Sequence, residues 1–180
     1  GDPASEQLAT YLGGVFKIGR LKTGTPARIA QTSIDFSRLE IQASEYQAPA
    51  MSYLPKPHDI EQKHCYITHT NPKTHEIILR HLDESPIFQK REELMGPRYC
   101  PSIEQKVDRF PEKDSHQIFV EPEGLNAKEI YPNGISTSLP FPAQVAFIRT
   151  IVGFESAVIT RPGYAISYGY FDPTGLRPSL

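Results

Sequence analysis

Proline is the residue that most limits what this chain can fold into. The sequence has 17 prolines in 180 residues, about twice the usual frequency of roughly 5%. Because proline interrupts helices and cannot donate to a β-ladder, this content predicts many irregular connections rather than a helical bundle. The 38% of hydrophobic residues is still enough to build the core of one globular domain.

Charge and hydropathy exclude several function classes. The formal net charge of -2 gives no global basic field, so any nucleic-acid contact must be local. No run of 18 apolar residues and no signal-peptide pattern occurs, which predicts a soluble, intracellular protein without a membrane span. Two cysteines, Cys65 and Cys100, are expected to be thiols. Because the chain lacks an initiator Met, we expect a piece of a longer protein.

Short helical and extended patterns follow one another without a repeat. Asn71 followed by Pro72 predicts a helix start, and Ser5 is a candidate cap for the first helix. These patterns favour an α/β or α+β fold with at least one sheet of mixed direction, and a long surface connection over 30–63. We expect helices over 7–11, 72–82, 101–110 and 143–151, and strands over 15–21, 65–70, 116–120, 157–160 and 164–168.

Residues 19–24 have the glycine spacing that opens a phosphate loop. Thr25 and Pro26 follow where a nucleotide triphosphate loop requires Lys and then Ser or Thr. No G-x-G-x-x-G pattern occurs, so the sequence has no dinucleotide-binding turn of its own. Two interpretations stay open, a tight turn with solvated charges and an anion site. The anion site would use three cations, Arg20, Lys22 and Arg28.

The segment around Cys100 is the strongest candidate for chemistry. If Pro101 is the first helical residue, Cys100 is the N-cap, and its sulfur faces the positive end of the helix dipole with Arg98 nearby. Both features favour a reactive thiolate. Cys100 is therefore a candidate nucleophile, and Lys106 and Arg109 could meet an anionic ligand. The alternative is that Cys100 is a small buried hydrophobe.

Three further groups of residues favour structural roles over chemical ones. Five His and Cys residues fit no zinc spacing, so we expect surface or packing histidines and no metal: His64, Cys65, His69, His75 and His81. The acidic residues are expected to be solvated: Glu104, Asp108, Glu112, Glu121 and Glu123. Aromatic residues near Arg161 either pack in a strand or stack on a ring: Tyr164, Tyr168, Tyr170 and Phe171.

Six blocks in one order carry a family resemblance that covers nearly the whole chain. They are GRLKTGTPAR at 19–28, CYITHTN at 65–71, GPRYCPSIE at 96–104, HQIFVEPEGL at 116–125, NGISTSLP at 133–140 and RPGYAI at 161–166. Together they resemble the GidA/MnmG family of tRNA-modifying flavoproteins. This resemblance implies an enzyme that uses FAD and works with an MnmE-type GTPase on the wobble uridine of tRNA.

The resemblance also implies a reaction and a cellular setting. Family members add a carboxymethylaminomethyl group at C5 of the uridine, with methylene-tetrahydrofolate, glycine or ammonium, and NADH. Full-length relatives are homodimers, found in the bacterial cytoplasm or in mitochondria.

Site residues implied by the resemblance lie in two places. Ser5 matches a flavin contact, and Cys100 matches a catalytic cysteine, whereas Cys65 does not match the family's second essential cysteine. The segment associated with NADH binding is Gly96, Pro97, Arg98, Tyr99, Cys100, Pro101, Ser102, Ile103, Glu104, Gln105, Lys106, Val107, Asp108, Arg109 and Phe110.

Departures from the family suggest that the chain is a central fragment. Family members are several times longer, and this sequence lacks their N-terminal FAD turn, second flavin motif and helical C-terminal region. We expect the mixed-sheet central part of a glutathione-reductase-like FAD domain (1–30), an inserted α/β subdomain (31–95), and an NAD-associated segment that returns to the FAD domain (96–180). The fragment alone is expected to be inactive. The alternative is a non-catalytic nucleotide- or tRNA-binding module that presents Arg20, Lys22, Arg28 and Arg98.

Overall fold

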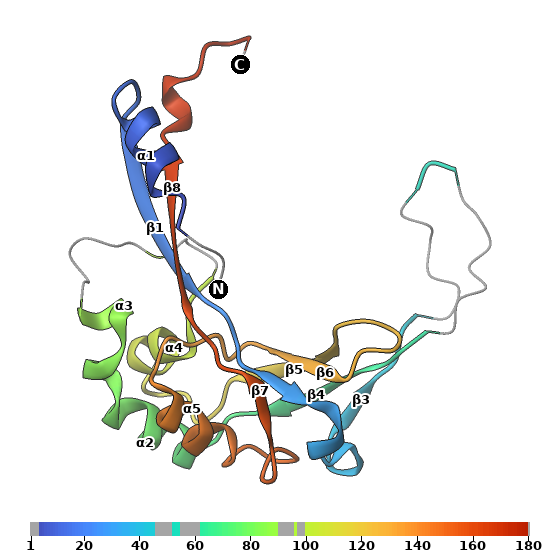
Figure 1. Cartoon of the computed structure of the whole chain (residues 1–180). Helices are drawn as coiled ribbons and strands as arrows, with labels where there is room; N and C mark the ends of the chain where they lie inside the picture. The colour runs from blue at the N-terminus through green and yellow to red at the C-terminus, as the bar shows by residue number, and fades with distance from the viewer. Residues whose placement is uncertain (1–3, 46–51, 55–61, 90–95, 97–99, 180) are drawn as a thin grey trace.

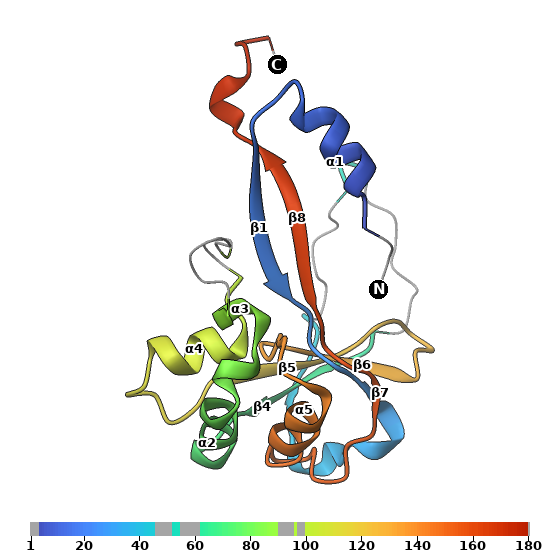
Figure 2. The same ribbon diagram turned by 60° about the vertical axis from the view of Figure 1, so that its left-hand side comes forward.

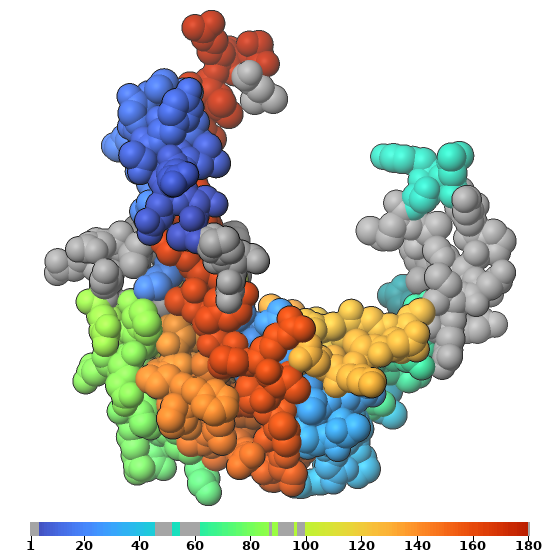
Figure 3. Space-filling model, in the orientation of Figure 1, coloured from blue at the N-terminus to red at the C-terminus, as the bar shows by residue number. Residues whose placement is uncertain are grey.

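A computed structural model describes residues 4–45, 52–54, 62–89, 96 and 100–179. They form a body, built from a β-sheet with helices on one face, and an arm that projects from it (Figures 1 and 2). Figure 3 shows the arm standing clear of the body as a separate lobe. Among the residues described, no helix combines the length and apolar character needed to cross a bilayer.

The body contains a six-stranded sheet in the order β3-β4-β5-β6-β2-β7. Each neighbouring pair is antiparallel, so the expectation of mixed direction is wrong for the described residues. The connection from β4 to β5 illustrates the reason. The chain leaves β4 at His69 and enters β5 at Gln117, which is paired with His69, so the two strands run in opposite directions. The strands are β2 (Arg28–Ala30), β3 (Glu40–Gln42), β4 (Cys65–His69), β5 (Gln117–Pro122), β6 (Glu129–Asn133) and β7 (Ile159–Arg161).

Helices cover one face of this sheet, and the core lies between the two layers (Figure 1). Alternation sets the face: Ile118 and Val120 of β5 are buried, and Phe119 between them is only partly so. The sheet side chains pack with Ile78 of α2 and Phe147 of α5, both fully buried. The helices are α2 (Pro72–Arg80), α3 (Pro86–Gln89), α4 (Ile103–Arg109) and α5 (Phe141–Ile148), with short 3₁₀ turns at Gln31–Ser33, Phe36–Arg38, Leu82–Glu84 and Pro173–Gly175.

The start of α2 confirms the prediction made from Asn71 and Pro72. The Asn71 side chain accepts a hydrogen bond from the Thr74 amide at 3.1 Å, and the Thr74 hydroxyl accepts one from the Asn71 amide at 3.2 Å. This reciprocal pair satisfies two backbone donors that a helix start otherwise leaves open.

The arm pairs β1 (Ile18–Gly24) with β8 (Ala165–Phe171), and α1 (Glu6–Gly13) lies near its tip (Figure 2). The segment 19–24 is therefore neither a tight turn nor a phosphate loop but a regular antiparallel strand. A Cβ at Gly19 would lie 2.3 Å from the Tyr170 ring, so a larger residue there requires the exposed Tyr170 side chain to move. Ser5 precedes α1, but its side chain makes no capping hydrogen bond, so the predicted cap is wrong.

Strands β2, β3 and β6 are absent from the predicted elements. The segment 129–133 reads as a turn because Pro132 and Asn133-Gly134 dominate it, yet Pro132 lies in β6 opposite Val120. Strands from all three predicted segments of the chain share one sheet. The division of the longer protein at 30/31 and 95/96 stays a prediction.

Candidate functional site around Cys100

Cys100 lies on the surface just before α4. The N-cap of this helix is Ser102, whose hydroxyl accepts a hydrogen bond from the Gln105 amide at 3.4 Å. The Gln105 side-chain oxygen accepts a second hydrogen bond, from the Ser102 amide, at 3.0 Å. Placing Cys100 at the cap is thus wrong by two residues, because serine followed three residues later by glutamine is a far better cap. Cys100 is exposed, which also excludes the buried alternative.

Burial divides the Gly96–Phe110 segment into two groups of residues. Pro97, Arg98 and Tyr99 lie outside the described residues. Lys106 is partly buried, its ammonium donates to the Gly134 carbonyl, and burial lowers its pKa. Among the described residues of the segment, the exposed positions are Gly96, Cys100, Pro101, Asp108, Arg109 and Phe110, and Gln105 is partly buried like Lys106. The buried positions are Ser102, Ile103, Glu104 and Val107.

Glu104 is completely buried, so its assignment to the solvated acids is wrong. Its Oε1 accepts hydrogen bonds from the Ser138 amide at 2.8 Å and the Thr137 hydroxyl at 3.0 Å. The Ser138 and Ser85 hydroxyls lie farther from the same oxygen, at 3.4 and 3.5 Å. Glu104 therefore joins α4 to two other segments of the body.

Tyr131 lies in β6 between the buried Ile130 and Pro132, so its side chain is on the sheet face away from the helices, called here the open face. The guanidinium carbon of Arg28 lies 4.5 Å from the centroid of the Tyr131 ring, a distance typical of a cation–π contact. Burial raises the pKa of Tyr131; Arg28 opposes this effect, and the charges of Cys100, Glu121 and Glu123 add to it. The phenol is therefore neutral at pH 7.

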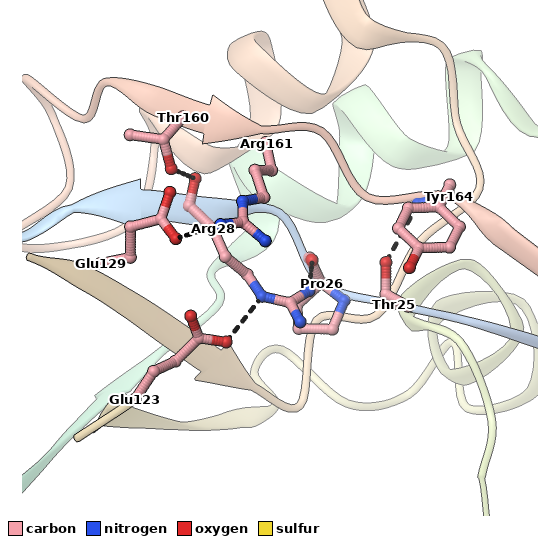
Figure 4. A network of polar contacts seen from close by, with 8 residues as sticks. All are labelled: Thr25, Pro26, Arg28, Glu123, Glu129, Thr160, Arg161 and Tyr164. Carbon is pink, nitrogen blue, oxygen red and sulfur yellow. Dashed lines mark hydrogen bonds and ion pairs between the residues drawn. The ribbon is translucent and has the colours of Figure 1, made fainter. Parts of the chain in front are cut away.

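Arg28 is held by its other contacts (Figure 4). Its Nε donates to Glu123 Oε1 at 2.9 Å, and its Nη1 donates to the Pro26 carbonyl at 3.1 Å. Arg161 on the neighbouring strand pairs with Glu129 at 3.3 Å. These contacts fix the guanidinium group over the Tyr131 ring.

Comparison with known proteins identifies the family of this chain. The family model described as "Glucose inhibited division protein A" (GIDA) matches residues 1–180. This chain belongs to the GidA family. Two crystal structures of Aquifex aeolicus GidA resemble it: form II with a TM-score of 0.82 and 45% identity, and form I with 0.84 and 46%. Each alignment covers 96% of this chain and only 28% or 30% of the Aquifex chain.

The three predicted anion contacts of this GidA-family chain do not act as one group. Arg20 on β1 is exposed. Lys22, two residues along, is buried, and its Nζ donates to the Pro86 carbonyl at 3.1 Å. Arg28 is engaged with Glu123 and Tyr131. Of the three, Arg20 alone presents its charge openly to solvent.

The histidines and Cys65 of the GidA-family chain differ in burial where the structure describes them. Across the described residues, no group of three or more His, Cys, Asp or Glu side chains is placed to hold a metal ion. His75 is a buried packing histidine, and its Nε2 lies 2.7 Å from the Thr70 hydroxyl. The Cys65 thiol is partly buried, and its pKa is raised by burial and by the Glu121 charge.

Sequence reasoning missed one residue of this site and misjudged the surroundings of another. Tyr131 was hidden because its strand was read as a turn. Glu104 was taken for a surface acid, although its position between Ile103 and Val107 on one helix face is a signal of burial.

Proposed function

We propose that this chain is the central part of an FAD-dependent enzyme that modifies the wobble uridine of tRNA at C5. The reaction of the whole protein uses methylene-tetrahydrofolate, glycine and NADH, and an MnmE-type GTPase is its partner. The observation that carries the proposal is the exposed Cys100 thiol just before α4, whose charge raises the pKa of the Tyr131 phenol. Membership of the GidA family supports it.

The residues present are compatible with the two cofactors. The Ser5 side chain is exposed and is not used to cap α1, so it can contact the flavin. In the Gly96–Phe110 segment, the exposed Arg109 is the cation best placed for a phosphate of NADH. The cofactors supply reducing equivalents to the reaction.

Each side chain at the site has a distinct role in this proposal. Cys100 is the nucleophile, since a thiolate is the strongest nucleophile that an amino-acid side chain provides. Tyr131 donates a hydrogen bond to the oxygen of the substrate ring that gains charge when a nucleophile adds. Arg28 stabilises that charge from the other side of the phenol and keeps the Tyr131 ring in place.

The test is Cys100→Ser in the full-length protein, with Cys65→Ser as the matched control. We expect Cys100→Ser to abolish the modified nucleoside while the flavin stays bound, and Cys65→Ser to retain most of the activity. Nucleoside analysis of tRNA and the flavin absorbance of the purified protein measure the two effects. Normal modified-nucleoside levels in Cys100→Ser would refute the role of the thiol.

A non-catalytic tRNA-binding module is the second candidate, and the exposed Arg20 is the observation that favours it. Replacing Arg20, Lys22, Arg28 and Arg98 by Ala then weakens tRNA binding. It also makes the slope of log K against log salt shallower, by about 0.9 for each lost phosphate contact to a duplex stem. An unchanged tRNA affinity removes this candidate.

A further inference from the structure

Glu104 combines complete burial with an uneven use of its two oxygens. Oε1 accepts all the hydrogen bonds of the carboxyl group, and Oε2 has no hydrogen-bond partner among the described residues. A leucine could fill this space without the cost of burying polar atoms. Stability alone therefore does not account for a carboxyl group at this position, and its directed bonds to Thr137 and Ser138 are what a leucine could not supply.

Thr137 is the point at which the arm meets the body. It forms an isolated antiparallel bridge with Thr25, just after β1, and its amide donates to the Thr25 carbonyl at 3.1 Å. Gly24 and Gly163 pack directly on it: a Cβ at Gly24 would lie 3.2 Å from the Thr137 backbone, and one at Gly163 would lie 3.0 Å from the Thr137 methyl group. Two strands of the arm thus depend on the position of one threonine.

The same segment holds the start of α4. The Ile103 amide donates to the Ser136 carbonyl at 2.7 Å, one residue before Thr137. Glu104 adds its bonds to Thr137 and Ser138 from the next position of the helix. Cys100 lies only two residues before the Ser102 cap, so the segment 136–138 contacts the arm on one side and the Cys100 end of α4 on the other.

We propose that Glu104 is a positioning residue that fixes the Cys100 end of α4 relative to the base of the β1–β8 arm. This inference rests on the proposed function, in which Cys100 acts on the substrate. The carboxyl group acts through Thr137 and does not touch the substrate. Loss of the Glu104 carboxyl group removes none of the reacting groups but changes the position of the Cys100 thiol.

The experiment compares three variants of the full-length protein. Glu104→Leu fills the space but removes the acceptor oxygens. Thr137→Val keeps the volume and removes the hydroxyl, which donates to Glu104 and accepts from the Leu139 amide. Glu112→Gln changes an exposed acid just beyond the same helix. The readouts are flavin content, kcat and KM for tRNA, and amide hydrogen exchange at Thr137 and Ser138.

We expect Glu104→Leu to lower kcat at least 10-fold and Thr137→Val about 3-fold, with KM and flavin content within twofold of the original protein. Exchange at Thr137 and Ser138 rises at least 10-fold in Glu104→Leu, because their donors lose the carboxylate oxygen that accepts from them. Glu112→Gln changes nothing. If Glu104→Leu fails to fold, Thr137→Val decides the question alone.

The proposal is overturned if kcat stays within twofold in the folded variants, or if it falls only in proportion to lost flavin. Unchanged exchange at Thr137 and Ser138 also overturns it. Hydrogen exchange does not depend on the reaction and therefore tests the role of Glu104 alone. The role of Cys100 is tested separately by Cys100→Ser, so the two failures can be told apart.

Discussion

The guanidinium carbon of Arg28 lies 4.5 Å from the centroid of the Tyr131 ring, on the sheet face opposite the helices. The two residues come from neighbouring antiparallel strands, β2 and β6, that are separated by about a hundred positions in the sequence. A cation over an aromatic face keeps the ring in one orientation. The charges of Arg28 and Cys100 act in opposite directions on the pKa of Tyr131, which links this pair to the candidate site.

Tyr131→Phe removes the phenol oxygen and keeps the ring under Arg28. Because the proposed role of Tyr131 is to donate a hydrogen bond, we expect kcat for tRNA modification by the full-length protein to fall about 100- to 1000-fold, the range for the loss of one donor at a site of developing charge. Stability should change by less than about 1 kcal/mol, since the ring packing is retained. Steady-state kinetics and thermal unfolding measure the two effects, and an unchanged kcat removes Tyr131 from the mechanism.

Arg28→Gln tests the contribution of the arginine to stability. It removes a cation–π contact and a partly buried ion pair with Glu123, each worth about 0.5–1 kcal/mol. We expect a loss of about 1–2 kcal/mol in denaturant unfolding. The control is Arg38→Gln, which breaks an exposed pair with Glu155 and should cost about 0.5 kcal/mol or less. Equal losses in the two variants would show that the contact with the ring contributes nothing.

Gly134→Ala should damage the turn that follows β6. Gly134 has a φ of +115°, a conformation that L-residues rarely adopt, and a Cβ there would lie 2.6 Å from the Gln117 carbonyl. We expect a loss of at least about 2 kcal/mol in denaturant unfolding. Gly124→Ala is the matched control, because a Cβ at that position meets nothing within 4 Å. A similar stability for the two variants would contradict the prediction.

The sequence was informative where one local interaction determines the structure. Asn71 and Pro72 define a helix start through bonds within four residues, and both ends of β4 could be read from its own side chains. The cap of α4 was misplaced because proline after Cys100 outweighed the Ser102–Gln105 pair in the interpretation. A helix start was therefore predicted correctly where the sequence offers one capping signal, and incorrectly where it offers two.

Long-range contacts account for the rest. Nothing near Arg28 in the sequence indicates that it will lie over Tyr131, because the pairing of β2 with β6 decides this. Glu104 likewise finds its donors at Thr137 and Ser138, more than 30 residues away. The family resemblance indicated Cys100, whereas the contacts of Arg28, Tyr131 and Glu104 became known only from the fold.

Acid should destabilise the body through His116. Burial, with Lys106, His75 and Lys113, lowers the pKa of this histidine to about 4, although Glu112 opposes the shift. An unfolded histidine titrates near 6.5, so between pH 6.5 and 4 the unfolded chain binds more protons than the folded one. The stabilisation is therefore complete above pH 6.5 and is lost as the pH falls toward 4, by about 1–3 kcal/mol for this group.

Denaturant unfolding between pH 4 and 7.5 measures this effect, with His116→Gln as the variant and His69→Gln as the control. His116 and His75 are buried with ring centroids 5.3 Å apart, whereas His69 is exposed at the end of β4. We expect a shallower pH dependence in His116→Gln and an unchanged one in His69→Gln. His75, whose pKa burial also lowers, leaves a residual slope of the same sign. If His116→Gln loses stability on acidification as steeply as the original chain does, His116 is not the group that titrates.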